Sequence, residues 1–160
     1  MSISSTNMEI AMPTSITIIQ AYPEHADQIA PLFDGYRQFY NQPSDVEAGR
    51  RFVLERLKND ESVIFLALDG EESVGFTQLF PAFSSVSMKR LWILNDLFVL
   101  PTARRRGVAR ALLERARQFA IETQSKGLVL ETAIDNPARH VYESLGWQRD
   151  TEFYHYSLLV

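Results

Sequence analysis

The chain has 160 residues, of which 46% are apolar and 22% are charged, and its formal net charge at pH 7 is −4. This size and balance fit one globular domain with its own core, and the negative total argues against a general nucleic-acid binder. The absence of cysteine excludes disulfides, thiol catalysis and cysteine-ligated metal sites.

Residues 1–14 are polar and lack the basic start and apolar centre of a secretory signal peptide. No apolar run in the chain approaches the roughly 18 residues that a membrane span needs. We therefore expect a flexible N-terminal tail over 1–14, a single domain over 15–160 and a cytoplasmic location.

The first predicted elements of the domain are a strand and a helix. Residues 15–22 are rich in β-branched side chains, which is typical of a strand. A helix is expected to start at Pro23 and to run towards residue 40. Pro31 and Gly35 are expected to bend or break it.

A second helix and a hairpin follow. Ser44 and Glu47 have the spacing of a capping box at the start of a helix. Two apolar runs over residues 62–83 flank Asp69 and Gly70, a pair that favours a tight turn between antiparallel strands.

The second half of the chain alternates strands with helices, and the whole order predicts one mixed α/β domain built around a sheet. The expected elements are a long strand over 88–100, a helix over 105–124, a short strand over 127–133, a helix over 136–146 and a strand pair over 147–160.

The junction between the long strand and the helix after it is strongly basic. Six of the chain's 16 basic residues lie between residues 104 and 117, against the single acid Glu114. The free backbone N–H groups of a helix start, together with the helix dipole, form an anion site. Gly107 allows close approach of the backbone, and arginines offer forked donors to phosphate oxygens. These features indicate a diphosphate ligand.

Other interpretations of this junction account for less of the pattern. A solvated basic helix would leave Gly107 without a role. A nucleoside-triphosphate loop would need G-x-x-x-x-G-K-[ST], which is absent, and a dinucleotide fingerprint would need three neighbouring glycines where this chain has one.

The pattern Arg104-x-x-Gly107-x-Ala109 after a long apolar strand resembles the acetyl-CoA signature of the GNAT family of N-acetyltransferases. "NPARHVYESLGW" resembles the second signature of that family, about 30 residues further on. The resemblance covers residues 15–160. It implies a mixed α/β fold with a mostly antiparallel twisted sheet of about seven strands, splayed between strands 4 and 5 and flanked by about four helices. "LNDLFV" and "YRQFYNQ" look closest to the fungal histone/polyamine and spermidine/spermine acetyltransferase branch.

The resemblance also implies acetyl-CoA as cosubstrate. The pantetheine arm would pair with the backbone of the long strand, as a peptide adds to an open sheet edge, and the pyrophosphate would lie on the amides at the helix start. Asn136 lies two residues before Ala138, where the family usually has its asparagine three before, so the loop is expected to be one residue shorter. The implied cofactor-binding residues are Leu97, Phe98, Val99, Arg104, Arg105, Arg106, Gly107, Val108, Ala109, Arg110 and Asn136.

Two residues carry the implied catalysis. Tyr142 matches the tyrosine that protonates the leaving thiolate as general acid, and a strand amide near Phe98 would donate to the oxyanion. Asn95 and Asp96 interrupt an apolar strand. The spermidine/spermine type has two acids at these positions. Here Asn95 replaces the first of them, so Asp96 is the only carboxylate of the pair. It would hold the substrate ammonium, relay its proton through water, or cap a strand bulge.

The acceptor is expected to be a primary amine: a small amine or polyamine, an amino acid or a protein lysine. Tyr36, Arg37, Tyr40 and Asn95 are the predicted substrate-binding residues, since aromatic rings can stand over a cation and Arg37 could pair with a carboxylate. The scattered histidines give no ligand cluster, so no metal is expected. We also expect a homodimer, with no nucleic-acid or membrane partner. A CoA-binding regulatory domain without turnover is the alternative function.

Overall fold

The computed structural model describes residues 15–160, so the predicted tail over 1–14 lies outside the described part of the chain. Two compact units are present, one ending at Val129 and the other covering Leu130–Val160. Among the described residues, no helix is both long and apolar enough to cross a membrane.

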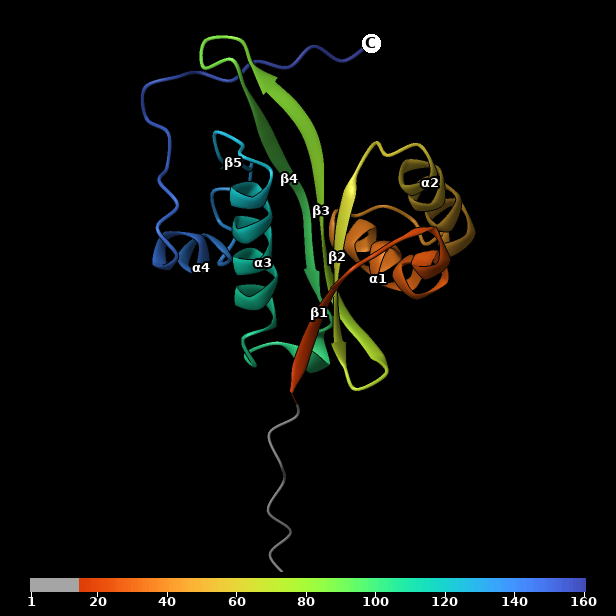
Figure 1. The fold of residues 1–160 in the computed structure, drawn as a ribbon. Helices are drawn as coiled ribbons and strands as arrows, with labels where there is room; N and C mark the ends of the chain where they lie inside the picture. Colours follow the sequence, from red (N-terminus) through yellow and green to blue (C-terminus); the bar gives the residue numbers. More distant parts are fainter. Residues whose placement is uncertain (1–14) are drawn as a thin grey trace, which may run out of the picture. The chain divides into compact units, whose positions relative to one another are not determined.

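The first unit contains a five-stranded sheet in the order β1-β2-β3-β4-β5. Neighbouring strands are antiparallel from β1 to β4, whereas β4 and β5 are parallel and pair only through Trp92↔Leu128 and Ile93↔Val129. The strands are β1 (Ile16–Gln20), β2 (Val63–Asp69), β3 (Glu72–Ser84), β4 (Lys89–Val99) and β5 (Leu128–Val129) (Figure 1).

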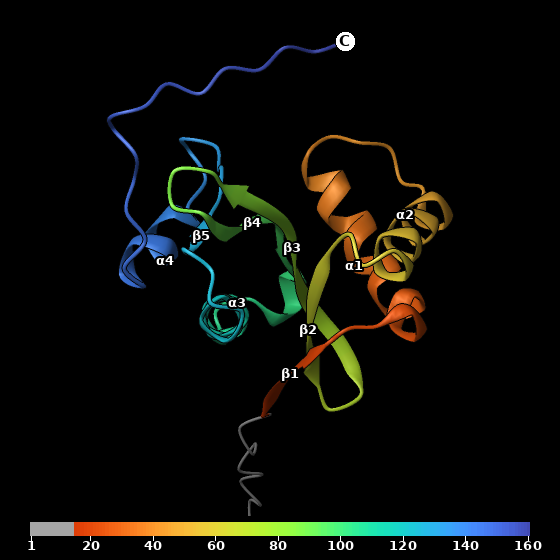
Figure 2. The same cartoon turned by 45° about the horizontal axis from the view of Figure 1, so that its top comes forward.

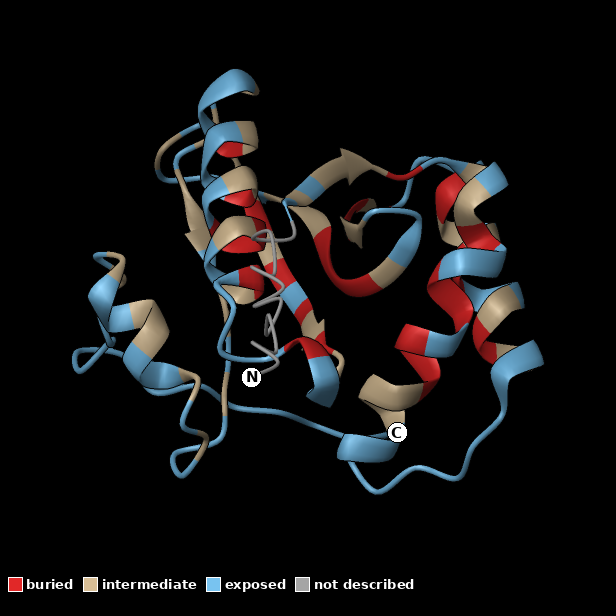
Figure 3. Ribbon diagram, turned by 90° about the horizontal axis from the view of Figure 1, so that it is seen from below, coloured by how far each residue is buried: buried red, intermediate tan, exposed pale blue. Residues whose placement is uncertain are grey.

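One face of this sheet is covered by α1 (Ala26–Phe39) and α2 (Val46–Lys58), as Figures 1 and 2 show. Both helices carry buried residues, coloured red in Figure 3. They form one core with strand residues, consisting of Ala21, Ile29, Leu32, Phe33, Val53, Leu57, Ile64, Leu66 and Phe76.

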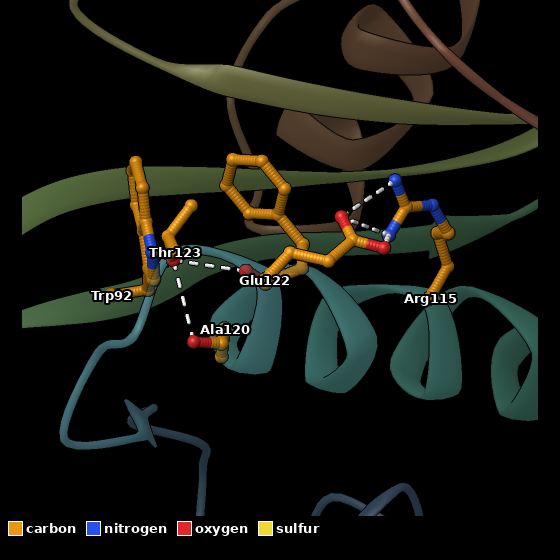
Figure 4. Close-up of polar contacts among 6 residues, drawn as sticks. Trp92, Arg115, Ala120, Glu122 and Thr123 are labelled. Carbon is orange, nitrogen blue, oxygen red and sulfur yellow. Dashed lines mark hydrogen bonds and ion pairs between the residues drawn. The ribbon is translucent and has the colours of Figure 1, made fainter.

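The opposite face is covered by α3 (Val108–Glu122) (Figures 1 and 2). The ring of Phe119 lies 5.1 Å from that of Trp92, centroid to centroid. Figure 4 shows how the end of α3 is attached to β4: Trp92 Nε1 donates to Thr123 Oγ1 over 2.9 Å. The same close-up shows an ion pair within α3, in which Arg115 Nη1 lies 3.3 Å from Glu122 Oε2. The contacts of Trp92 with Phe119 and Thr123 fix the end of α3 along the sheet.

Several expected boundaries differ from the structure. Pro31 and Gly35 are expected to bend or break the first helix, but α1 runs through both residues, so the break is wrong: an exposed proline in the second turn removes only one backbone hydrogen bond. The predicted capping box is also wrong. Asp45 caps α2 by accepting from Ala48 N over 2.9 Å, whereas the Ser44 hydroxyl donates to Asp34.

The expected count of seven strands is wrong, because the described residues form five. The strand expected over 127–133 contains only Leu128–Val129, and the strand pair expected over 147–160 is absent. The aromatic and apolar side chains of 147–160 favour a strand, but a strand also needs a hydrogen-bonding partner, which residue pattern does not supply.

The second unit contains α4 (Arg139–Ser144). Gly146, at φ 88°, ends its last turn in the left-handed conformation that glycine tolerates. The backbone N–H of Trp147 donates to Tyr142 O over 3.1 Å, and the two rings lie 5.9 Å apart. The last turn of α4 and the residue after it therefore hold Tyr142 in place.

Candidate active site

A β-bulge interrupts β4 at the polar pair of that strand. Gln78 of β3 is the partner of Asp96, and Leu79 is the partner of Leu94, so Asn95 has no partner in β3. A bulge inserts one residue into a strand and changes which face the later side chains occupy.

This change of face determines where the carboxylate of the pair lies. Trp92 stands against Phe119 of α3, whereas Phe98 stands against Gly35 of α1. In a regular strand these two even-numbered residues would share one face. The bulge therefore turns Asp96, together with Phe98, towards α1.

Asp96 is 2% exposed and lies in a cluster of polar groups. Its Oδ2 accepts from Gln78 Nε2, and its Oδ1 accepts from Asn95 Nδ2 over 2.8 Å. Its main-chain oxygen accepts from the Thr77 hydroxyl over 2.8 Å. Burial raises the pKa of Asp96 above its ordinary value, although hydrogen bonds from Gln78 and Asn95 act in the opposite direction. A carboxyl of this kind is suited to taking up a proton.

The aromatic residues predicted for the acceptor lie at the end of α1, beside this cluster. The Tyr36 hydroxyl donates to Asn95 O over 3.0 Å, and its ring meets that of Tyr40 edge-on at 5.1 Å. Burial and the charge of Asp96 raise the pKa of Tyr36, so its hydroxyl stays protonated. Arg37 turns elsewhere: its Nη1 donates to Pro43 O over 3.3 Å.

A second buried carboxylate, Asp34, holds the connection between α1 and α2. It accepts from the Ser44 hydroxyl at 2.7 Å, the Asp45 backbone N–H at 2.8 Å and Gln38 Nε2 at 2.8 Å. Burial opposes its ionisation, but these hydrogen bonds prevail and lower the pKa of Asp34 below its ordinary value. Asp34 therefore fixes the helix that carries Tyr36.

The basic junction forms a turn with two left-handed residues, Arg105 at φ 60° and Gly107 at φ 78°. Gly107 is the N-cap of α3, with no side-chain cap, so the helix begins at Val108 and not at the predicted residue 105. The first amides of a helix have no acceptor within the helix, so the start of α3 after this turn could bind an anion.

The arginines of this junction play different parts. Arg104 Nε donates back to Val99 O over 3.1 Å, which ties the turn to the end of β4. Arg106 Nη2 pairs with Asp69 Oδ2 of β2 at 2.9 Å. Both guanidinium groups therefore brace the turn, while Arg105 and Arg110 are exposed beside its amides.

The predicted pantetheine edge is the end of β4. Beyond Ile93, no strand among the described residues pairs with β4 on the β5 side. Leu97, Phe98 and Val99 lie in this stretch, and a peptide-like ligand could add to it by backbone hydrogen bonds. The predicted site thus brings together the bulge, the open edge and the start of α3 within one unit.

The other two predicted site residues lie in the second unit. Asn136 Oδ1 accepts from Ala138 N over 3.0 Å, so this side chain closes the turn before α4. Tyr142 lies on α4 itself.

Residue patterns missed Gln78 and Thr77, which are both fully buried beside Asp96. A signal was present, because "TQ" interrupts the apolar run of β3 as "ND" interrupts that of β4. Gly35 was read as a helix breaker, whereas it allows Phe98 to approach α1: a Cβ there would lie 2.8 Å from Phe98 Cζ. Among the described residues, no group of histidines and carboxylates could hold a metal ion.

Comparison with known proteins gives consistent similarities. The model of the acetyltransferase (GNAT) family matches residues 27–147. An uncharacterized N-acetyltransferase of Bacillus subtilis (strain 168), YhfO, is 49% identical over 146 residues, which are 91% of this chain and 98% of that protein.

Solved structures are similar as well. The crystal structure of a probable acetyltransferase has a TM-score of 0.85 at 49% identity and covers 90% of this chain and 97% of its own. An aminoglycoside N-acetyltransferase in complex with CoA has a TM-score of 0.76 and covers 93% of this chain and 98% of its own. Its identity of 20% makes this a likeness of fold.

Proposed function

The chain belongs to the GNAT family of acetyltransferases and is an N-acetyltransferase, and we propose that it transfers the acetyl group of acetyl-CoA directly to a small primary amine. The observation that carries this proposal is the position of Asp96, a buried carboxyl of raised pKa between the open edge of β4 and the aromatic end of α1.

The turn before α3 is the proposed seat of the pyrophosphate. Its two left-handed residues, Arg105 and Gly107, support this assignment because such a turn directs successive backbone N–H groups towards one point. Members of the GNAT family use acetyl-CoA, and the residues present here fit a diphosphate. The amides of Val108, Ala109 and Arg110 hold the phosphate oxygens, and the exposed Arg105 adds charge.

The open stretch of β4 is the proposed seat of the pantetheine arm. Leu100 N donates to Val74 O on the β3 side, and hydrogen bonds alternate along a strand, so the backbone groups of Leu97 and Val99 face the open side. Val99 pairs with the amides of the arm, and the amide of Leu97, next to Phe98, donates to the oxyanion that develops on the acetyl carbonyl. Close packing of the Phe98 side chain on Gly35 supports this role of the neighbouring amide, since the strand that carries an oxyanion donor must be fixed before the reaction.

Asp96 is the proposed base. An amine is protonated at neutral pH and must lose a proton before it attacks. Because Asp96 is only 2% exposed, it takes that proton through a bridging water. Tyr142 is the proposed general acid for the leaving thiolate, with Asn136 near the pantetheine arm. The match of both residues to the second family signature supports these two assignments.

The acceptor is proposed to be a flexible primary amine, polyamines included. The rings of Tyr36 and Tyr40 beside Asn95 and Asp96 support a cationic acceptor, because aromatic faces and a carboxylate both attract an ammonium group. The similarity of "YRQFYNQ" to the polyamine branch agrees with this class. Arg37 takes part less directly, since it binds Pro43 O.

The family model includes parts of both units, which supports one N-acetyltransferase domain over 15–160. A homodimer in the cytoplasm remains part of the proposal, and sedimentation equilibrium would test the dimer. A CoA-binding domain without turnover is not supported, because the relatives are described as acetyltransferases.

Thiol release from acetyl-CoA, measured over a panel of diamines, polyamines, amino acids, aminoglycosides and lysine peptides, tests the proposal. We expect turnover with small primary amines. Tyr142→Phe should lower kcat roughly 100-fold with little change in CoA affinity, whereas the control Tyr154→Phe should leave both unchanged. Equal losses of kcat and of CoA affinity in Tyr142→Phe would make this tyrosine structural, and CoA binding without release on any amine would overturn the proposed reaction.

A further inference from the structure

Gln78 and Asp96 are paired across β3 and β4, and both side chains are buried, at 0% and 2% exposure. Gln78 Nε2 donates to Asp96 Oδ2. Gln78 Oε1 is also buried, yet it accepts no hydrogen bond from any described residue. Buried polar atoms normally have a partner, so half of this amide is satisfied and half is not.

The two protonation states of a carboxyl group need different hydrogen-bond partners. An ionised carboxylate only accepts hydrogen bonds, whereas a protonated carboxyl also offers an O–H donor. A primary amide carries a donor nitrogen and an acceptor oxygen on the same carbon. A half-turn about the last side-chain bond of Gln78 would therefore exchange the group that faces Asp96 Oδ2.

We propose that Gln78 is the positioning residue of Asp96: its amide donates to the ionised carboxylate and turns over to accept from the protonated carboxyl. The proposal rests on the proposed function, in which Asp96 is the base. When the acceptor ammonium releases its proton, the N–H bond breaks, the O–H bond of Asp96 forms, and the amine nitrogen keeps the electron pair for attack. Gln78 Oε1 then gains the partner that it lacks while Asp96 is ionised.

Of the described groups around Asp96, Gln78 is the one with a buried acceptor that lacks a partner. From β3, Thr77 binds the main-chain oxygen of Asp96. From β4, Asn95 is a second primary amide beside Asp96, but it is exposed, so water can satisfy its oxygen in either protonation state. From α1, the titratable groups are Tyr36 and, behind it, Tyr40, and the raised pKa of Tyr36 keeps that hydroxyl protonated. Among the described residues, no cation contributes to the pKa shift of Asp96.

The chain contains a matched internal control. Gln38 Nε2 donates to Asp34 Oδ2 over 2.8 Å, so the same amide–carboxylate pair occurs twice. Gln38 is exposed, and water can reach its amide oxygen. The pKa of Asp34 is lowered and that of Asp96 is raised, so this second carboxyl loses its charge at lower pH than Asp96 does.

The side-chain amide resonances of the full-length protein, labelled with ¹⁵N at the glutamine side chains, test the proposal. Through-bond correlation assigns them, so no variant of Gln78 is needed. Between pH 4 and pH 9 we expect the Gln78 resonance to titrate and the Gln38 resonance to stay constant. Asp96→Asn should abolish the Gln78 titration. A Gln78 resonance that does not respond to pH, or one that still titrates in Asp96→Asn, would overturn the inference.

The pH profile of kcat/KM gives a second test. Gln78→Met keeps the length of the side chain and removes the donor, so the ionised carboxylate loses its partner and the acidic limb should move to higher pH. On that limb kcat/KM should fall roughly tenfold, while the plateau above it should change less than about threefold. An equal loss at every pH would make Gln78 merely structural and would refute the proposal.

The two tests separate the inference from the function on which it rests. If the Gln78 resonance titrates with Asp96 but Asp96→Asn retains full turnover, Asp96 is not the base and the proposed mechanism fails. If Asp96→Asn removes turnover and the Gln78 resonance does not titrate, the mechanism stands and the inference about Gln78 fails.

Discussion

The hydroxyl of Tyr36 on α1 donates to the main-chain oxygen of Asn95 over 3.0 Å, across 59 positions of the chain. This oxygen belongs to the residue that the bulge leaves without a partner in β3. The first helix therefore completes the hydrogen bonding of the bulge, and the bulge turns Asp96 towards that helix.

Tyr36→Phe removes this hydroxyl and keeps the ring. We expect the free energy of unfolding to fall by about 1 kcal/mol, because the oxygen of Asn95 loses its donor. KM for the amine should rise, since the bulge beside the acceptor site is then held less firmly. Urea denaturation and steady-state kinetics measure the two effects. Tyr154→Phe is the control, and an equal change in both variants would contradict the assigned role of Tyr36.

Gly35→Ala tests the contact between α1 and Phe98. The new Cβ would lie 2.8 Å from Phe98 Cζ, so the ring must move. We expect a loss of about 1–3 kcal/mol in stability, and a lower kcat because the strand backbone that carries the proposed oxyanion donor shifts with the Phe98 ring. Gly127→Ala is the matched control, because a Cβ at Gly127 meets no atom within 4 Å. Wild-type kcat in Gly35→Ala would separate Phe98 from the chemistry.

Asp34 and Asp96 are both buried, and their pKa values are shifted in opposite directions. For Asp34 the pKa is lowered in the folded state, so its contribution to stability is present above the ordinary carboxyl pKa of about 4 and is lost as pH falls through the folded value. For Asp96 the pKa is raised. Its contribution is present below about pH 4 and is lost as pH rises through the folded value.

The asparagine variants should therefore have opposite effects on thermal stability at pH 7.5. Asp34→Asn should lower Tm, corresponding to about 2 kcal/mol, because hydrogen bonds to a carboxylate are replaced by weaker ones. Asp96→Asn should raise Tm at pH 7.5 and leave it nearly unchanged at pH 3.5, since asparagine resembles the protonated carboxyl. A lower Tm of Asp96→Asn at pH 7.5 would mean that the folded state prefers the ionised form.

Gly107 has a left-handed backbone conformation and also leaves space where a side chain would stand, and three variants separate these two properties. A Cβ at Gly107 meets no atom within 4 Å, but its φ of 78° disfavours most side chains. Gly107→Ala should cost about 1 kcal/mol in stability, and Gly107→Asn less. Gly107→Glu should in addition weaken CoA binding roughly tenfold or more, because it brings a negative charge to the anion site. Calorimetric titration measures the affinity, and equal affinities in the alanine and glutamate variants would move the pyrophosphate elsewhere.

The parts of the candidate site that are local in sequence could be predicted from residue patterns. A basic cluster with one glycine at the end of an apolar strand marks the turn before α3, and the structure has the left-handed residue there at Gly107. The polar pair Asn95 and Asp96 stood out within an apolar strand for the same reason.

The remaining features depend on pairing between distant segments. The bulge at Asn95 depends on how β4 is aligned with β3. Asp45 and not Ser44 caps α2, because the Ser44 hydroxyl donates to Asp34, ten positions earlier. The missing strands over 147–160 show the same limit, because side-chain propensity does not provide a neighbouring strand. Gln78 could have been marked as polar within β3, but its partner could not.

The central claim is that Asp96 deprotonates the acceptor amine, and the turnover of Asp96→Asn with the best amine of the panel tests it most directly. We predict that kcat/KM falls roughly 100-fold or more at pH 7.5, while the affinity for acetyl-CoA changes less than about twofold. Wild-type kcat/KM in this folded variant, with an unchanged pH profile, would contradict the claim.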